Sequence, residues 1–172
     1  MHHADKRKVF LNPGEFLFGE QGTHIHTLLG SCIAITLWHP DLQIGGMCHF
    51  VLPERTSADP ETSIPPCGRY GDEAMELFER AAELHGTHLS DYHGKIFGGA
   101  DMFGTNSEEE LVGCKNAEKA MNMLRLRNVD IQVAHVGESG SRRVVLDVSS
   151  GDVWVKHMAE DGHRFNSTSG IN

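Results

Sequence analysis

The chain of 172 residues has no long hydrophobic run and little positive charge. No apolar segment approaches the roughly 20 residues that a transmembrane helix needs, so we expect a protein that is not embedded in a membrane. Lys and Arg number 15 against 24 Asp and Glu, which gives a formal net charge of -9. Because nucleic-acid-binding proteins need clustered cations to contact phosphates, this balance argues against a nucleic-acid partner.

Common motifs of metal and redox sites are missing too. None of the four cysteines belongs to a CxxC pair, so the sequence indicates neither a zinc ribbon nor a thioredoxin-type site. There is no HExxH motif among the twelve histidines. His24 and His26 could share one strand face and bind a metal, but two solvated histidines fit that pattern better.

The N-terminal segment MHHADKRKVF is charged and lacks the apolar core of a signal peptide, so we expect a cytoplasmic protein with reduced thiols. A composition of 39% hydrophobic and 23% charged residues is typical of soluble globular proteins. The length favours one domain, residues 1–172, with a core over about 12–158. We expect the first residues and 159–172 to be flexible tails.

Short runs rich in β-branched residues predict strands, and two segments with helical spacing interleave with them. The apolar residues at i, i+3, i+4 and i+7 from Ala74 to Ala81 predict a helix that stops near Gly86. Asn116 is expected to cap a second helix, in which Ala117 begins the same spacing. The class is therefore α/β (α+β) with a mixed sheet. The expected strands lie within residues 25–29, 33–37, 44–52, 95–98, 131–137, 142–148 and 152–156.

A predicted hairpin brings a cysteine and a histidine together. A type I turn over HPDL (39–42) is centred between Pro40 and Asp41, which would place Cys32 directly opposite His49. Directly opposed residues share a face, with Cβ atoms roughly 4.5–5.5 Å apart, so thiol and imidazole could touch. The opposite face, with Ile33, Ile35, Leu37 and Ile44, is expected to be core.

Such a pair suits nucleophilic catalysis, because the thiolate is the reactive form and an imidazole can take the thiol proton. A third group should hold the imidazole, and the hydroxyl of Thr27 is the nearest candidate. Backbone N–H groups at Gly30 and Ser31 could stabilise an oxyanion. A purely structural pair remains an alternative, since free cysteines are commonly buried.

Five motifs occur in an order that resembles the CheD family of chemoreceptor glutamine deamidases. They are TLLGSCIAITLWHP with GGMCHFVLP, then RYGDEAMELF, KIFGGADMF, VGCKNAEKA and GESGSRRVVLDVSSGDVWVK. The resemblance covers the chain from about residue 12 to residue 156. It implies a mixed β-sheet sandwich flanked by helices, similar to the catalytic domain of cytotoxic necrotizing factor toxins.

The resemblance also implies an activity: conversion of selected glutamines on methyl-accepting chemotaxis receptors to glutamates, with release of ammonia. Cys32 matches the family's nucleophile, His49 its general base and Thr27 its third member. No metal or organic cofactor is implied, and a CheC-type phosphatase is an implied partner in some systems. A non-catalytic chemotaxis binding module is the alternative, and hydrolysis of glutamate methyl esters would pass through the same acyl-enzyme.

Overall fold

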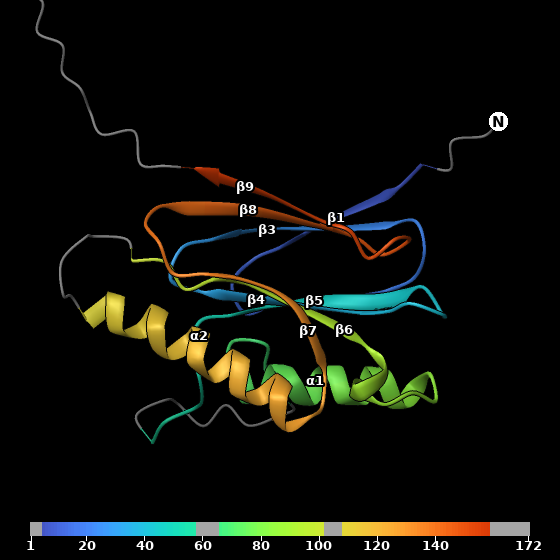
Figure 1. Ribbon diagram of the computed structural model, residues 1–172, viewed down its shortest axis with the longest axis horizontal. Coiled ribbons are helices and arrows are strands. Elements are labelled where there is room, and N and C mark those ends of the chain that lie inside the picture. Colours follow the sequence, from blue (N-terminus) through green and yellow to red (C-terminus); the bar gives the residue numbers. More distant parts are fainter. Residues whose placement is uncertain (1–4, 58–65, 102–107, 159–172) are drawn as a thin grey trace, which may run out of the picture.

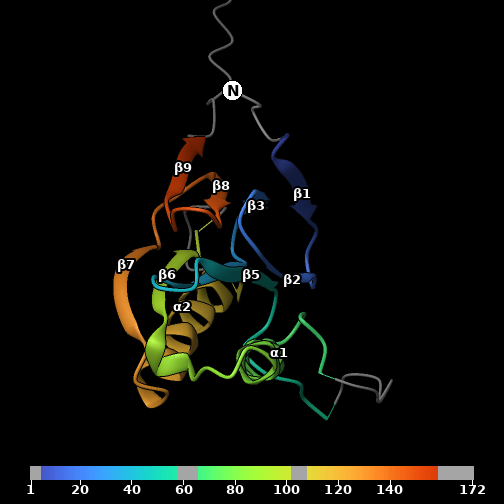
Figure 2. The same cartoon turned by 90° about the vertical axis from the view of Figure 1, so that its right-hand side faces the viewer.

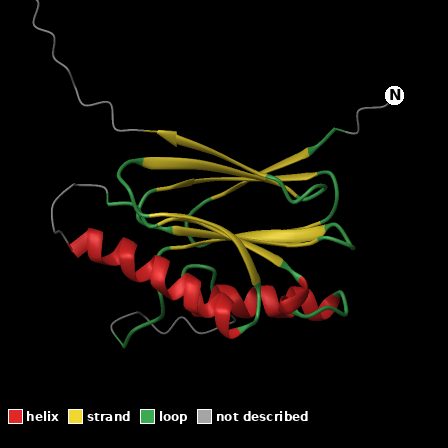
Figure 3. Cartoon of the chain, in the orientation of Figure 1, coloured by secondary structure: helices red, strands yellow, loops and turns green. Residues whose placement is uncertain are grey.

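The computed structural model describes residues 5–57, 66–101 and 108–158, and these form three layers. Two β-sheets lie face to face, and both long helices cover the outer face of one sheet (Figures 1 and 3). This is the mixed sandwich with helices that the sequence predicts, although the helices flank it on one side only. Neither helix in the described ranges combines the length and apolar composition needed to span a bilayer. The expected tail 159–172 lies outside these ranges.

One sheet has four strands and the other has five. The four-stranded sheet has the order β1-β3-β8-β9, comprising β1 (Arg7–Leu11), β3 (Thr23–Leu29), β8 (Ser141–Asp147) and β9 (Val153–Met158). The five-stranded sheet has the order β2-β5-β4-β6-β7, comprising β2 (Phe16–Gly19), β5 (Ile44–Phe50), β4 (Ile33–His39), β6 (His93–Gly98) and β7 (Asp130–Val136). Only the pairs β1–β3 and β6–β7 are parallel.

Two helices form the third layer, α1 (Gly71–Leu84) and α2 (Glu108–Leu126), and a 3-10 turn, η1 (Leu89–Asp91), precedes β6. The predicted helical spacing in α1 is confirmed, because Ala74 and Phe78 are fully buried against the five-stranded sheet. The predicted stop is also confirmed: α1 ends at Leu84, and Gly86 has a left-handed φ of 69°.

The central strands β4 and β5 are buried on both faces, because the five-stranded sheet lies between the helices and the second sheet (Figure 2). Ile33, Ile35 and Leu37 face the helices, as the alternation predicts, together with Cys48. Ala34 and Met47 face the other sheet and pack with its apolar side chains. Each face of β4 and β5 therefore contributes to a separate hydrophobic core.

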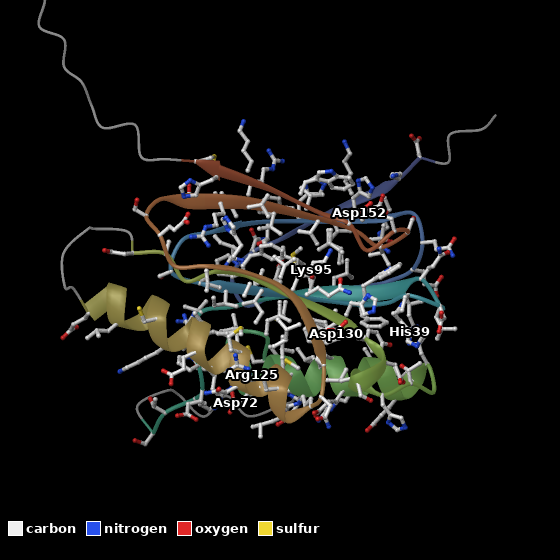
Figure 4. All side chains as sticks on the ribbon, in the orientation of Figure 1. His39, Asp72, Lys95, Arg125, Asp130 and Asp152 are labelled. Atoms are coloured by element: carbon white, nitrogen blue, oxygen red, sulfur yellow. The ribbon has the colours of Figure 1, made fainter. Side chains whose placement is uncertain are left out.

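The two sheets are also joined by polar contacts across their interface. Lys95, from β6, points toward the four-stranded sheet (Figure 4), and its Nζ donates to the carbonyl of Gly151 at 2.9 Å. The indole N–H of Trp38 donates to the carbonyl of Val148 at 2.8 Å. Both contacts attach the five-stranded sheet to the turn between β8 and β9.

The predicted register of the β4–β5 hairpin is wrong by two residues. Ala34, not Cys32, lies opposite His49. The N–H of Leu42, which would close a type I turn, donates to His39 Nδ1 at 3.2 Å. The N–H of Gln43 closes the loop on the His39 carbonyl at 2.9 Å, with a φ of 51° at Gln43. A shift of two residues preserves the side-chain faces, so Cys32 and His49 still face the same way.

Two further predictions differ from the structure. Asn116 is not an N-cap: α2 begins eight residues earlier, and Asn116 is fully buried in its middle. The expected core began at about residue 12, but Arg7–Leu11 form β1, which pairs with β3. Leu11 is 3% exposed, so the end of this strand belongs to the inter-sheet core.

Gly98 allows β6 to approach the chain at Cys32. It has a φ of 110°, and a Cβ at this position would collide with the Cys32 carbonyl oxygen. The next residue, Gly99, donates its N–H to that oxygen at 3.0 Å. The glycine pair is therefore a close approach as well as a turn.

We predict that Gly98→Ala lowers the free energy of unfolding by about 2–4 kcal/mol, from backbone strain together with overpacking. Gly86→Ala is the matched control, because Gly86 also has a positive φ but nothing lies within 4 Å of a Cβ there. It should lose only about 1–2 kcal/mol. Urea unfolding of both variants measures the difference, and equal losses would contradict the close approach.

Candidate active site

The residues predicted to carry the chemistry gather at one end of the sandwich, between the two sheets. His49, near the end of β5, is 1% exposed and faces the four-stranded sheet. Thr27, on the facing side of β3, is fully buried. Its Oγ1 lies 2.7 Å from Nδ1 of His49. The predicted contact between these two residues is therefore present, and it joins the two sheets.

The partners of Thr27 determine which ring nitrogen of His49 carries the proton. The Thr27 hydroxyl donates to the carbonyl of Leu11 at 2.9 Å, because a carbonyl can only accept. That donation uses the only hydroxyl hydrogen, so His49 Nδ1–H is the donor to Thr27. Nε2 then holds the lone pair, and it is buried without a hydrogen-bond partner among the described residues. This is the tautomer that can accept a proton at Nε2.

Cys32 lies just before β4, half-buried, and packs against the inter-sheet core. His49 pairs with Ala34, so Cys32 and His49 are diagonal neighbours on one face. Cα atoms in that relation are roughly 7–8 Å apart, within reach of long side chains. No hydrogen bond joins the Cys32 thiol to His49 in the described structure. The pair is adjacent, but it is not engaged in this state.

The loop carrying the thiol is held by its carbonyl groups. The carbonyl of Gly30 accepts the N–H of Ala100 at 3.0 Å, and that of Cys32 accepts the N–H of Gly99. The Ser31 carbonyl accepts from the side chain of Asn116 at 3.3 Å. Among the described residues, no backbone carbonyl accepts the N–H groups of Gly30, Ser31 or Cys32. The N–H of Cys32 does lie against the sulfur of its own side chain, which lowers the pKa of the thiol slightly against the effect of burial.

Asn116, expected as an N-cap, instead supports the candidate site from the middle of α2. Its side-chain Nδ2 donates both to the Ser31 carbonyl and, at 2.8 Å, to the carbonyl of Val51, just beyond β5. One side chain of α2 therefore ties the loop before Cys32 to the segment after His49. A buried polar residue inside a helix is a signal for such a contact, but the helical pattern alone assigned it to a cap.

Arg142 was not identified as a functional residue by the sequence analysis. It lies on β8 opposite Leu29 and is 0% exposed. Its Nη1 donates to the carbonyls of Gly98, at 3.1 Å, and of His135. The guanidinium therefore holds the ends of β6 and β7 beside the Cys32 loop. Burial lowers the pKa of Arg142, an effect that Glu138 opposes.

Burial favours the neutral forms of both Cys32 and His49. It lowers the pKa of His49 to about 4, although the nearby carboxylate of Glu15 acts in the opposite direction. Burial also raises the pKa of the Cys32 thiol, although the positive charge of Arg69 opposes it. At neutral pH the site therefore contains a thiol and a neutral imidazole rather than a preformed thiolate–imidazolium pair.

The pair His24 and His26, and the buried thiol of Cys48, lie away from this site. His24 and His26 do share a strand face, on the outer side of the four-stranded sheet, with ring centroids 6.4 Å apart. No group of three potential metal ligands occurs among the described residues. Cys48 faces the helices, as predicted, and burial raises its pKa to about 12.

Comparison with known proteins places the chain in a family. The model described as "CheD chemotactic sensory transduction" matches residues 51–157. A protein of Dechloromonas aromatica, named "Probable chemoreceptor glutamine deamidase CheD 3", is 46% identical over 153 residues, 88% of each chain. A Pseudomonas fluorescens protein, named "Probable chemoreceptor glutamine deamidase CheD", is 39% identical over 171 residues, 95% of this chain and 94% of its own. The chain belongs to the CheD family.

Similarity persists in a more distant relative. A Leptospira interrogans protein named "Probable chemoreceptor glutamine deamidase CheD 1" is 34% identical over 156 residues, 86% of this chain and 91% of its own. The resemblance inferred from five short motifs is therefore confirmed over most of the chain. The family model begins after Cys32 and His49, so the case for these two residues depends on the geometry described above.

We predict that Thr27→Val lowers turnover about 10- to 100-fold, because a buried donor left unpaired costs roughly 1–3 kcal/mol. Here that donor is Nδ1–H of His49. Thr27→Ser keeps the hydroxyl and should remain within a few-fold of wild type. Turnover with a receptor fragment, together with melting temperatures, measures the effect. Equal turnover of the Val and Ser variants would show that the hydroxyl does not orient the imidazole.

The neutral pair predicts how the reactivity of Cys32 depends on pH. Because the thiol pKa lies above its usual value of 9.0, the thiolate fraction should rise through and beyond neutral pH. Alkylation by iodoacetamide should therefore accelerate about tenfold per unit between about pH 6 and pH 8. Replacing the exposed Cys67 and Cys114 by Ser isolates the signal. A plateau below neutral pH would indicate a preformed ion pair and contradict this prediction.

Proposed function

We propose that this chain is a cysteine-dependent protein-glutamine deamidase that acts on chemoreceptors. Its relatives are named chemoreceptor glutamine deamidases, and it shares most of its length with them. The observation that carries the proposal is the hydrogen bond from Nδ1–H of His49 to Thr27, which leaves Nε2 free on the face shared with Cys32.

In the first half of the reaction, Nε2 of His49 removes the thiol proton as Sγ of Cys32 attacks the carbon of the glutamine carboxamide. The tetrahedral intermediate carries its negative charge on the former carbonyl oxygen. The N–H groups of Ser31 and Cys32, which no described backbone carbonyl accepts, can donate to that oxygen, with Gly30 providing room for its approach. Protonation by His49 then allows the C–N bond to break, and ammonia leaves behind a thioester.

In the second half, neutral His49 takes a proton from water, which attacks the thioester carbon. The C–S bond breaks, the sulfur recovers a proton, and the substrate leaves as a glutamate. The net change is amide plus water to carboxylate plus ammonium. Every proton transfer in this scheme uses Nε2, which is why the tautomer fixed by Thr27 matters. A glutamate methyl ester could enter the same route, with methanol as the leaving group.

The described geometry requires a small closure before reaction. No hydrogen bond links the thiol of Cys32 to His49, and catalytic hydrogen bonds commonly tighten only when substrate is bound. Asn116 restrains both the Cys32 loop and the segment after His49, and Thr27 holds the imidazole, so we expect the closure to involve the side chain of Cys32 rather than the strands.

The alternative function is a binding module that engages a receptor or a CheC-type phosphatase without catalysis. Such a module has no need for a tautomer-fixed histidine beside a thiol. We also propose a cytoplasmic location, because the receptor segments that would be modified must be reached from that side.

We predict that incubation with the cytoplasmic fragment of a cognate chemoreceptor converts selected glutamines to glutamates and releases ammonia. Cys32→Ala should abolish conversion, because no other described thiol lies in this site. His49→Ala should lower it at least about 100-fold, the usual contribution of a general base. Peptide mass spectrometry locates the modified glutamines, and an ammonia assay confirms the stoichiometry.

Cys48→Ala is the matched control for this experiment, because it removes a neighbouring buried thiol on the helix-facing side. It should retain conversion. A folded wild-type protein that modifies no receptor glutamine, while still binding the fragment, would favour the binding module. Conversion that survives Cys32→Ala would contradict the proposed nucleophile.

A further inference from the structure

The four-stranded sheet has an uncovered outer face. Both helices lie against the five-stranded sheet, and no described segment crosses the far side of β1, β3, β8 and β9 (Figures 1 and 2). An antiparallel sheet can expose one face to water, but that face is then expected to be mainly polar. The composition of this face differs from that expectation.

Large apolar side chains are exposed there. Phe10 is 51% exposed, Leu28 is 46% exposed and Trp154 is 53% exposed, and they come from three different strands. The register aligns one row across the whole sheet, from Phe10 through His26 and Val145 to Trp154. Three strand spacings make this row roughly 14 Å long, and it crosses the strands rather than following one of them.

Cations flank this apolar row. On one side of the row lies Lys8, two residues before Phe10 on β1. On the other side lies a second row, in which Leu28, Arg143 and Lys156 are opposite one another on β3, β8 and β9. The three cations are exposed, and none makes an ion pair with a described residue. Figure 4 shows several long side chains tipped with nitrogen projecting from this face.

Negative charge is scarce on the same face. Asp147 is the one carboxylate at an outward position of these four strands within the described residues. Its Oδ2 already lies 2.8 Å from Lys6 Nζ and 3.0 Å from His24 Nε2. Burial and the surrounding positive charges, with Arg143 first among them, lower the pKa of His26. A chain of net charge -9 therefore presents a positive, partly apolar face.

This outer sheet face reaches the active site. Leu28 directly follows Thr27, and Arg143 directly follows Arg142, with side chains alternating between the two faces of the sheet. The row of Leu28, Arg143 and Lys156 is thus about one residue step from the loop that carries Cys32. A partner bound on this face would therefore lie next to the end of β3, which leads into the Cys32 loop.

We propose that the outer sheet face is an exosite that docks an acidic, amphipathic helix of the receptor substrate. This inference rests on the function proposed above, since that function makes the substrate a protein. Acidic side chains would meet Lys8, Arg143 and Lys156, while apolar side chains would cover Phe10 and Trp154. A row of roughly 14 Å matches about ten residues of helix at 1.5 Å per residue.

The test reverses charge on two opposite surfaces. The variant Arg143→Glu/Lys156→Glu changes the exosite, and Lys115→Glu/Arg125→Glu makes the same change on exposed positions of α2. Each is combined with Cys32→Ala, and binding to the cytoplasmic receptor fragment is measured by calorimetry. The exosite variant should bind at least tenfold more weakly than the α2 variant. In the catalytically intact background, it should raise KM with little change in kcat.

Trp154 supplies an independent readout. Its fluorescence should shift to shorter wavelength when the fragment binds, and Trp154→Ala should remove that shift while the second tryptophan, Trp38, remains. Alkylation of Cys32 should be unchanged in the exosite variant, which separates docking from damage to the site. Equal binding by the two charge-reversal variants would overturn the proposal.

The exosite and the proposed activity fail in different ways. Binding that depends on Arg143 and Lys156 without any deamidation would support the exosite and reject the enzyme. Deamidation that is indifferent to both residues would support the enzyme and reject the exosite. Self-association in sedimentation experiments that is lost in the exosite variant, with receptor binding retained, would make a second copy the occupant and overturn the proposal.

Discussion

The structure depends on one buried hydroxyl. Thr27 gives its hydrogen to the carbonyl of Leu11 and accepts the hydrogen of His49 Nδ1, so strands from both sheets meet at a single oxygen. Polar groups this deeply buried are stable only when they are hydrogen-bonded, so the contact between Thr27 and His49 holds the two sheets at a fixed spacing. The same contact places the imidazole proton on Nδ1. The burial that makes this network necessary also keeps the pair of Cys32 and His49 uncharged.

The loop that carries Cys32 illustrates how the candidate site is built from segments distant in sequence. Its carbonyls are bound by the turn after β6 and by Asn116 of α2, while Arg142 of β8 holds the end of β6. All these contacts use carbonyl groups of the loop or of its support, and no described backbone carbonyl accepts the N–H groups of Ser31 and Cys32. Because this loop is held through its backbone carbonyl groups, its backbone N–H groups can point toward a substrate. N–H donors are what a developing oxyanion requires.

Much of this fold follows from local patterns, and the exceptions have specific causes. Alternation along β4 and β5 correctly placed Ile35 and Cys48 on one core face, because a two-residue period survives a two-residue register error. The register itself depends on the hydrogen bond from the N–H of Leu42 to the ring of His39. Turn propensities do not predict this contact. Asn116 was expected to be a cap because a helical pattern carries no information about its hydrogen-bond partners, Ser31 and Val51. Leu11 was expected to lie in a tail because the local sequence does not show its pairing with β3.

Charge on this molecule is unevenly distributed, and the distribution matters more than the total. At physiological ionic strength, charges are screened over about 8 Å, so a partner close to the outer sheet face senses Lys8, Arg143 and Lys156 rather than carboxylates on the far side. The net charge of -9 would repel an acidic protein approaching from most other directions. Repulsion elsewhere and attraction at one face together favour a single orientation, in which the outer face of the four-stranded sheet meets the partner.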